Sequence, residues 1–146
     1  MESFKKNPAE SMKIKLTPLP DFFSEKRDAA TAELAYKRAI ECAQAQREED
    51  DVMASLYLKM AWINRLRGDQ EKEKTNMGHA LAHYIGVYEN SDQVEISRVM
   101  YLIGELNRRL GNNKEAVQWF SRVANDSNSS QAMRHRARQA WQTLRQ

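Results

Sequence analysis

The residues 99–123, VMYLIGELNRRLGNNKEAVQWFSRV, constrain the fold more than any other stretch of this sequence. Apolar and small residues recur at intervals of three or four in its first half, which places them on one face of an α-helix: Met100, Ile103, Gly104 and Asn107. Gly111 follows and favours the left-handed conformation that closes a helix C-terminus. A second helical stripe comes after it, with Ala116, Phe120 and Val123. The stretch therefore predicts two helices joined by a tight turn.

Two positions in this stretch carry sharper expectations. Asn113 is the expected N-cap of the second helix, because its side-chain oxygen can accept from a free backbone N–H. A glycine inside a helix costs about 1 kcal/mol relative to alanine. Gly104 therefore predicts the close approach of another helix.

The same unit recurs imperfectly along the chain. INRLRGDQEKE at residues 63–73 echoes LNRRLGNNKEA at residues 106–116, so Gly68 corresponds to Gly111. The helix before Gly68 repeats the first stripe with Tyr57, Met60, Ala61 and Asn64, and the helix after it carries Met77 and Ala80. Gly78 and Gly86 in that second helix predict close helix packing, with a kink as the alternative. A helix capped by Asp28 and running over residues 29–47 repeats the second stripe with Ala32, Tyr36 and Ala39.

These residues resemble the tetratricopeptide repeat (TPR), a helix-turn-helix unit of about 34 residues. The matches are small residues at Gly104, Ala116 and Val123, with Phe120 and the turn glycine Gly111; Met100 and Asn107 stand where that family has aromatic residues. The resemblance implies an all-α fold of antiparallel helix-turn-helix repeats, a TPR-like superhelix. After the loop at residues 125–130, the helix with Ala137, Trp141 and Leu144 on its inner side is the expected C-terminal cap.

The domain division follows from the prolines, all three of which lie within the first twenty residues. We expect an extended N-terminal arm over residues 1–27 and a TPR-like helical domain over residues 28–146. Phe22 and Phe23 either anchor the arm on the helices or belong to a partly disordered terminus. Pro18 and Pro20 also forbid a regular first helix for the first repeat. One packing face is then open to the arm or to a second subunit, so a homo-oligomer is one outcome.

A wider resemblance covers residues 20–144. The runs YKRAIECA, SLYLKMAWINRLRGD and YLIGELNRRLGNNKEAVQWFSRV resemble the C-terminal region of an uncharacterised bacterial family common in Firmicutes. In that family a Cys-containing segment precedes a TPR-like part. Its cysteine pairs have no counterpart here, so no zinc site is carried over. The resemblance implies fold and class, without an activity.

No catalytic or cofactor-binding constellation stands in the sequence, so an enzyme is not expected. His79 and His83 share a helical face, but they lack a third ligand, and no metal site is predicted. Cys42 is the one cysteine, which gives no support for an oxidising compartment. No apolar run approaches the length of a membrane span, and the N-terminus lacks a signal-peptide core. We therefore expect a cytoplasmic protein with no membrane partner.

The predicted function is a non-enzymatic protein-protein interaction module or scaffold. TPR proteins bind an extended peptide or a helix in a concave groove lined by the first helix of each pair. The repeat register places on that face, together with Ser55, Leu58 and Leu102, the predicted partner-binding residues Lys59, Trp62, Arg65, Arg98, Tyr101, Glu105, Arg108 and Arg109. The alternative is that Trp62 and Tyr101 complete the core under the N-terminal arm and the arginines are merely solvated.

The net charge of +3 is compatible with acidic partners. It leaves a second candidate function, a nucleic-acid-associated protein that uses the basic groove and the Arg-rich last helix. That helix carries Arg134, Arg136 and Arg138, which point in different directions, and Arg145. A solvated helix surface is the preferred interpretation of these arginines.

Overall fold

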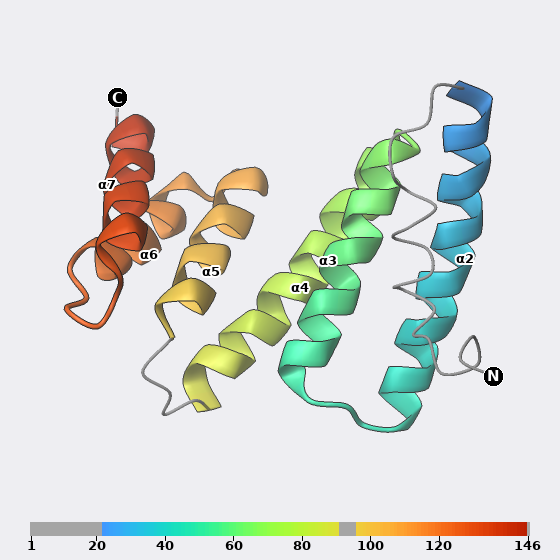
Figure 1. Ribbon diagram of the computed structural model, residues 1–146, viewed down its shortest axis with the longest axis horizontal. Helices are drawn as coiled ribbons and strands as arrows, with labels where there is room; N and C mark the ends of the chain where they lie inside the picture. The colour runs from blue at the N-terminus through green and yellow to red at the C-terminus, as the bar shows by residue number, and fades with distance from the viewer. Residues whose placement is uncertain (1–21, 91–95, 146) are drawn as a thin grey trace. The chain divides into compact units, whose positions relative to one another are not determined.

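The computed structural model describes residues 22–90 and 96–145, with side chains from Arg27 onward. This part of the chain is all-α, as predicted, and contains no strand (Figure 1). Its helices are α2 (Phe22–Ala45), α3 (Asp50–Leu66), α4 (Gln70–Asn90), α5 (Ser97–Arg109), α6 (Asn113–Ala124) and α7 (Gln131–Arg145). The chain divides into two compact units, Met1–Ala80 and Leu81–Gln146. Residues 1–21 of the predicted arm lie outside the described residues.

In the N-terminal unit α2 packs antiparallel to α3. Glu33 of α2 pairs with Arg67 just after α3, whereas Gln44 near the end of α2 donates to Tyr57 Oη at 2.9 Å. The buried stripe of α2 follows helical spacing and comprises Ala29, Ala32, Tyr36, Ile40 and Ala43. Burial raises the pKa of Tyr36 above its ordinary value, because the phenolate would lose its hydration.

Three expectations about α2 were wrong. The helix begins at Phe22, before the predicted start, so Asp28 lies inside the helix and does not cap it. Pro20 is the last proline in the chain, so no proline ring interrupts the backbone hydrogen bonds of α2. Ala39 is only half-buried, because the buried stripe passes through Ile40.

Asn64 ties α3 to α4 across the turn that joins them. It is almost fully buried, and its amide nitrogen donates to the carbonyl oxygens of Met60 at 3.1 Å and Lys72 at 3.3 Å. Its side chain also contacts the amide of Asn76 in α4 at 2.6 Å. Met77 and Ala80 of α4 are buried, as predicted.

Three helices end in the same way. After α5, the backbone N–H of Gly111 donates to Arg108 O at 3.1 Å and that of Asn112 donates to Asn107 O at 2.8 Å. This pair of hydrogen bonds is the Schellman motif, and it requires a left-handed residue. The predicted turn glycines fill that place after α3 and α5, with φ of +75° at Gly68 and +87° at Gly111. After α2 the same place is taken by Arg47, with φ of +53°.

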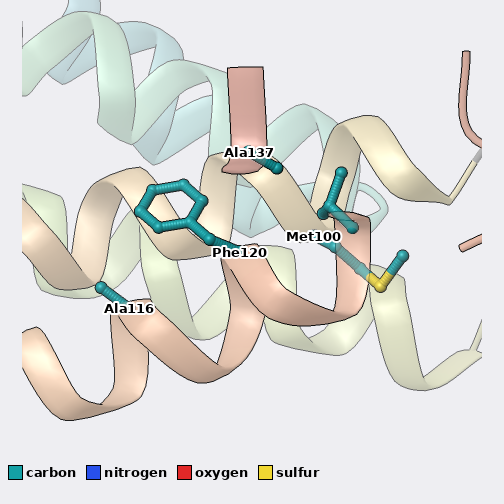
Figure 2. Packing of buried hydrophobic residues seen from close by; sticks show 5 residues of the cluster. Met100, Ala116, Phe120 and Ala137 are labelled. Carbon is teal, nitrogen blue, oxygen red and sulfur yellow. The ribbon is translucent and has the colours of Figure 1, made fainter. Parts of the chain in front are cut away.

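In the C-terminal unit α5 packs on α6, and α6 packs on α7. Figure 2 shows the centre of this unit, a cluster of buried residues from all three helices: Met100, Ala116, Phe120, Val123 and Ala137. Ala137 is fully buried, while Trp141 and Leu144 are half-buried and pack against the cluster. The predicted inner side of the last helix is therefore confirmed.

Gly104 lies directly against the ring of Phe120. A Cβ atom at Gly104 would come within 2.7 Å of Phe120 Cε1, closer than real Cβ contacts. The predicted close approach is confirmed here. It is wrong for Gly78, where a Cβ would meet no atom within 4 Å.

The predicted N-cap of α6 was also wrong. The helix starts at Asn113 itself, so the cap position falls on Asn112, which makes no side-chain capping bond. Asn112 instead donates its side-chain amide to Asn107 Oδ1 at 3.3 Å. The Schellman motif brings Asn112 to the end of α5, and the turn is one residue shorter than predicted.

Candidate protein-binding faces

One side of α3 is left open to solvent, because the core covers the opposite side of the helix. Met60, Ala61 and Asn64 point into the core. The open side, called the α3 face below, consists of residues at helical spacing: Ser55, Leu58, Lys59, Trp62, Arg65 and Leu66. The repeat register predicted all of them except Leu66.

Large apolar side chains are concentrated on α3. Among the residues whose side chains the structure describes, four large hydrophobic side chains are exposed: Leu34 lies on α2, while Val52, Trp62 and Leu66 lie on α3. Trp62 is 53% exposed and Leu66 is 46% exposed. They stand one helical turn apart and form a continuous apolar surface. More than half of Trp62 is exposed, and residues 1–21 of the arm that was expected to cover it lie outside the described residues.

Leu66 was missed, although its spacing of four from Trp62 was visible in the sequence. Basic residues flank this apolar surface. Arg65 is exposed and Lys59 is half-buried. Just beyond α3, Arg67 pairs with Glu33 at 3.0 Å, so its charge is already engaged. The α3 face thus combines a flat apolar centre with positive charge at its edge.

The corresponding side of α5 is called the α5 face below. It lies opposite the buried residues Met100, Ile103 and Asn107. It comprises the predicted residues of this helix, Arg98, Tyr101, Leu102, Glu105, Arg108 and Arg109. Arg98, Arg108 and Arg109 are exposed, and the other three are half-buried.

Glu105 is already engaged by its own helix. Arg108 donates to both carboxylate oxygens, with Nε to Oε1 at 3.1 Å and Nη2 to Oε2 at 2.9 Å. Arg109 Nε lies 3.9 Å from the same Oε2. The hydrogen bond to Glu105 raises the pKa of the Arg108 guanidinium. The three residues together carry one positive charge, so the α5 face presents cationic groups rather than a free carboxylate.

Tyr101 belongs partly to the core. Its ring packs on Phe120 with centroids 5.2 Å apart, and the guanidinium of Arg136 lies 5.9 Å from its ring centre. The alternative that Tyr101 completes the core thus holds for one side of the ring. Arg136 comes from α7, and its position beside the α5 face could not be found from the spacing within either helix.

The structure groups the predicted residues by unit. Lys59, Trp62 and Arg65 share the α3 face in the N-terminal unit. The remaining five share the α5 face in the C-terminal unit: Arg98, Tyr101, Glu105, Arg108 and Arg109.

The histidine and cysteine side chains of the described residues do not form a metal-binding cluster. His79 packs its ring on Tyr57, with centroids 4.7 Å apart. Within residues 22–90 and 96–145, no three His, Cys, Asp or Glu side chains are grouped closely enough to hold a metal ion. Cys42 is exposed on α2. Among the described helices, none combines the length and the apolar character that crossing a bilayer requires.

These features define an all-α protein with an apolar and a cationic helix face exposed. The chain belongs to the family described as an uncharacterized protein conserved in bacteria (DUF2225), whose model matches residues 1–144. This confirms the predicted resemblance to an uncharacterised bacterial family. No curated protein and no solved structure matched the sequence.

Proposed function

We propose that the protein is a non-enzymatic interaction module that binds a peptide or helix of another protein through the α3 and α5 faces. The observation that carries the proposal is the exposed apolar surface of Trp62 and Leu66 beside Arg65. Aromatic and arginine side chains dominate the energetics of protein interfaces. Large apolar surfaces left in water mark interaction sites more often than chance.

The finer part of the proposal is the TPR-like arrangement. In TPR proteins the first helices of successive pairs line one concave groove and serve a single bound segment. The supporting features are the repeated glycine turns and the contact of Gly104 with Phe120. A cytoplasmic location is part of the same proposal.

The test compares partners recovered from lysate of the native cell by the wild-type protein and by single-face variants. Trp62→Ala removes the centre of the α3 face, and Arg108→Ala removes the bidentate arginine of the α5 face. Truncating an interface residue of this kind costs at least about 2 kcal/mol where it is a main contact, or roughly 30-fold in affinity. Each variant should therefore lose the same partner.

Leu34→Ala and Arg38→Ala are matched controls, since both remove exposed side chains of the same kind from α2. They should retain the partner. Recovery of every partner by well-folded Trp62→Ala would refute the proposal. If Trp62→Ala lost the partner and Arg108→Ala retained it, the α3 face alone would be the binding site and the shared groove would be refuted.

A further inference from the structure

The charge of this protein is divided unevenly along the chain. Residues 96–145 contain nine basic and three acidic side chains, a net charge of +6, and eight of the nine are arginines. Residues 27–90 contain nine basic and eleven acidic side chains, a net charge of −2. The small net charge of the whole chain therefore conceals a strongly cationic region. Such asymmetry is typical of proteins that bind polyanions.

The arginines of α7 are not spread evenly around the helix. Arg134, Arg138 and Arg145 share one flank with Trp141, at intervals of four, three and four residues. Arg136 lies on the other flank, over Tyr101 of α5. The arginines of α7 therefore do point in different directions, as expected, but three of the four share one flank. The flank with Arg134, Arg138, Trp141 and Arg145 is called the α7 stripe below.

The α7 stripe is free of compensating acid. The helix itself contains no Asp or Glu. Within the described residues, no carboxylate forms an ion pair with Arg134, Arg138 or Arg145, in contrast to Arg67 and Arg108. At 1.5 Å per residue, the three guanidinium groups are spread over about 16 Å of helix. They form a row of unpaired positive charges.

Trp141 gives the stripe a flat apolar surface. The ring is half-buried against the core, and the guanidinium of Arg145 lies 4.8 Å from its centre. The α6 helix offers a similar arrangement, in which Arg122 lies 4.4 Å from the ring centre of Trp119. Aromatic rings interleaved with arginines are the elements on which proteins stack single-stranded bases.

We infer that the α7 stripe binds the sugar-phosphate backbone of a single-stranded nucleic acid, with one base stacked at Trp141. Guanidinium groups match phosphate oxygens with two parallel hydrogen bonds. A nucleic-acid strand carries one negatively charged phosphate per nucleotide, which suits a row of arginines. A duplex would hide its bases from Trp141, and an acidic peptide would leave the ring without a planar partner. This inference concerns a surface other than the α3 and α5 faces and does not depend on them.

The test measures the anisotropy of a fluorescent 20-nucleotide oligouridine RNA as the full chain is added at 50 mM salt. About three phosphate contacts predict a slope of about −2 for log K against log salt. Affinity should therefore fall roughly 20-fold between 50 and 200 mM salt. Arg134→Gln/Arg138→Gln/Arg145→Gln should abolish most of the binding and flatten that slope. Trp141→Leu keeps an apolar side chain and should weaken binding at least about fivefold.

The matched control is Lys37→Gln/Arg38→Gln/Lys74→Gln, which removes three exposed charges from α2 and α4. Both triple variants have the same net charge, so only the location of the charge differs. The control should bind the RNA almost as tightly as the wild type. Circular dichroism checks that every variant is folded.

Four results would overturn the inference. The first is no binding of the RNA at 50 mM salt. The second is equal loss of binding in both triple variants, which would indicate net charge alone. The third is competition by polyglutamate as effective as that by unlabelled RNA, which would assign the stripe to acidic protein segments. Tighter binding of a duplex of the same length would equally exclude the single-stranded form.

Discussion

At the scale of single residues, Gly104 decides how closely α5 and α6 approach. The ring of Phe120 is fully buried and occupies the space that a side chain at Gly104 would need. Other core residues hold the ring, so it cannot move away without disturbing Met100 or Ala137. The helix tolerates the poor propensity of glycine here because the ring packs against it.

We predict that Gly104→Ala destabilises the protein by about 1 kcal/mol. The gain in helix propensity is about 1 kcal/mol, but overpacking a filled core costs roughly 1–3 kcal/mol. Gly78→Ala is the control, because a Cβ at that mid-helix glycine meets nothing. It should stabilise by about 0.5–1 kcal/mol. Urea unfolding followed by circular dichroism measures both, and a Gly104→Ala protein more stable than the wild type would contradict the prediction.

Two buried asparagines stand at equivalent places in the repeat, Asn64 near the end of α3 and Asn107 near the end of α5. Asn107 donates to the carbonyl oxygen of Ile103 at 2.9 Å, and Asn64 makes the same bond to Met60 at 3.1 Å. The backbone carbonyl oxygen of each asparagine also accepts an N–H from the turn that follows. A buried polar side chain is tolerated only when its hydrogen bonds are satisfied. The side chain of Asn107 connects α5 to Asn112 in the following turn, and the side chain of Asn64 connects α3 to α4. The TPR pattern has an aromatic residue at this place.

At the scale of elements, the C-termini of α2, α3 and α5 are set by a left-handed residue. Gly68 and Gly111 adopt this conformation without steric cost, and Arg47 adopts it despite carrying a Cβ. A Cβ at either glycine would meet no neighbouring atom. Any penalty for a substitution there therefore comes from the backbone conformation alone.

Gly111→Ala should therefore lower the free energy of unfolding by about 1 kcal/mol. Arg47→Gly is the reverse change at the equivalent place and should raise it by about 0.5–1 kcal/mol. Chemical denaturation of the two variants and of the wild type gives both differences. The same sign for the two substitutions would show that the turns are not equivalent.

At the scale of the whole molecule, the location of charge matters more than its sum. Residues 96–145 carry +6 and residues 27–90 carry −2. Because charges separated by more than a Debye length of about 8 Å are screened at physiological salt, each region acts on its surroundings almost independently. A negatively charged surface should therefore bind residues 96–145 in preference to residues 27–90.

Cation-exchange chromatography tests this division without any biological ligand. Arg134→Gln/Arg138→Gln/Arg145→Gln should elute at clearly lower salt than the wild type. Lys37→Gln/Arg38→Gln/Lys74→Gln has the same net charge but should elute close to the wild type, since its cationic region is intact. Coincident elution of the two triple variants would indicate that net charge alone governs binding to the resin.

The sequence by itself determined what depends on neighbours in the chain. Helical spacing predicted the buried faces of α3, α5 and α6, and Gly68 and Gly111 predicted where helices end. These features follow from local backbone geometry, so a window of a few residues contains the information. The same spacing placed Lys59, Trp62 and Arg65 on one face of α3.

Only the tertiary structure decided what depends on residues far apart in the chain. Trp62 and Tyr101 lie on the corresponding faces of α3 and α5, yet Trp62 remains exposed while Tyr101 packs between Phe120 and Arg136. Gly78 and Gly104 are both glycines inside helices, but only Gly104 has a ring against it. Burial and close contact are properties of the partner that a helix meets, and the spacing within one helix does not specify that partner.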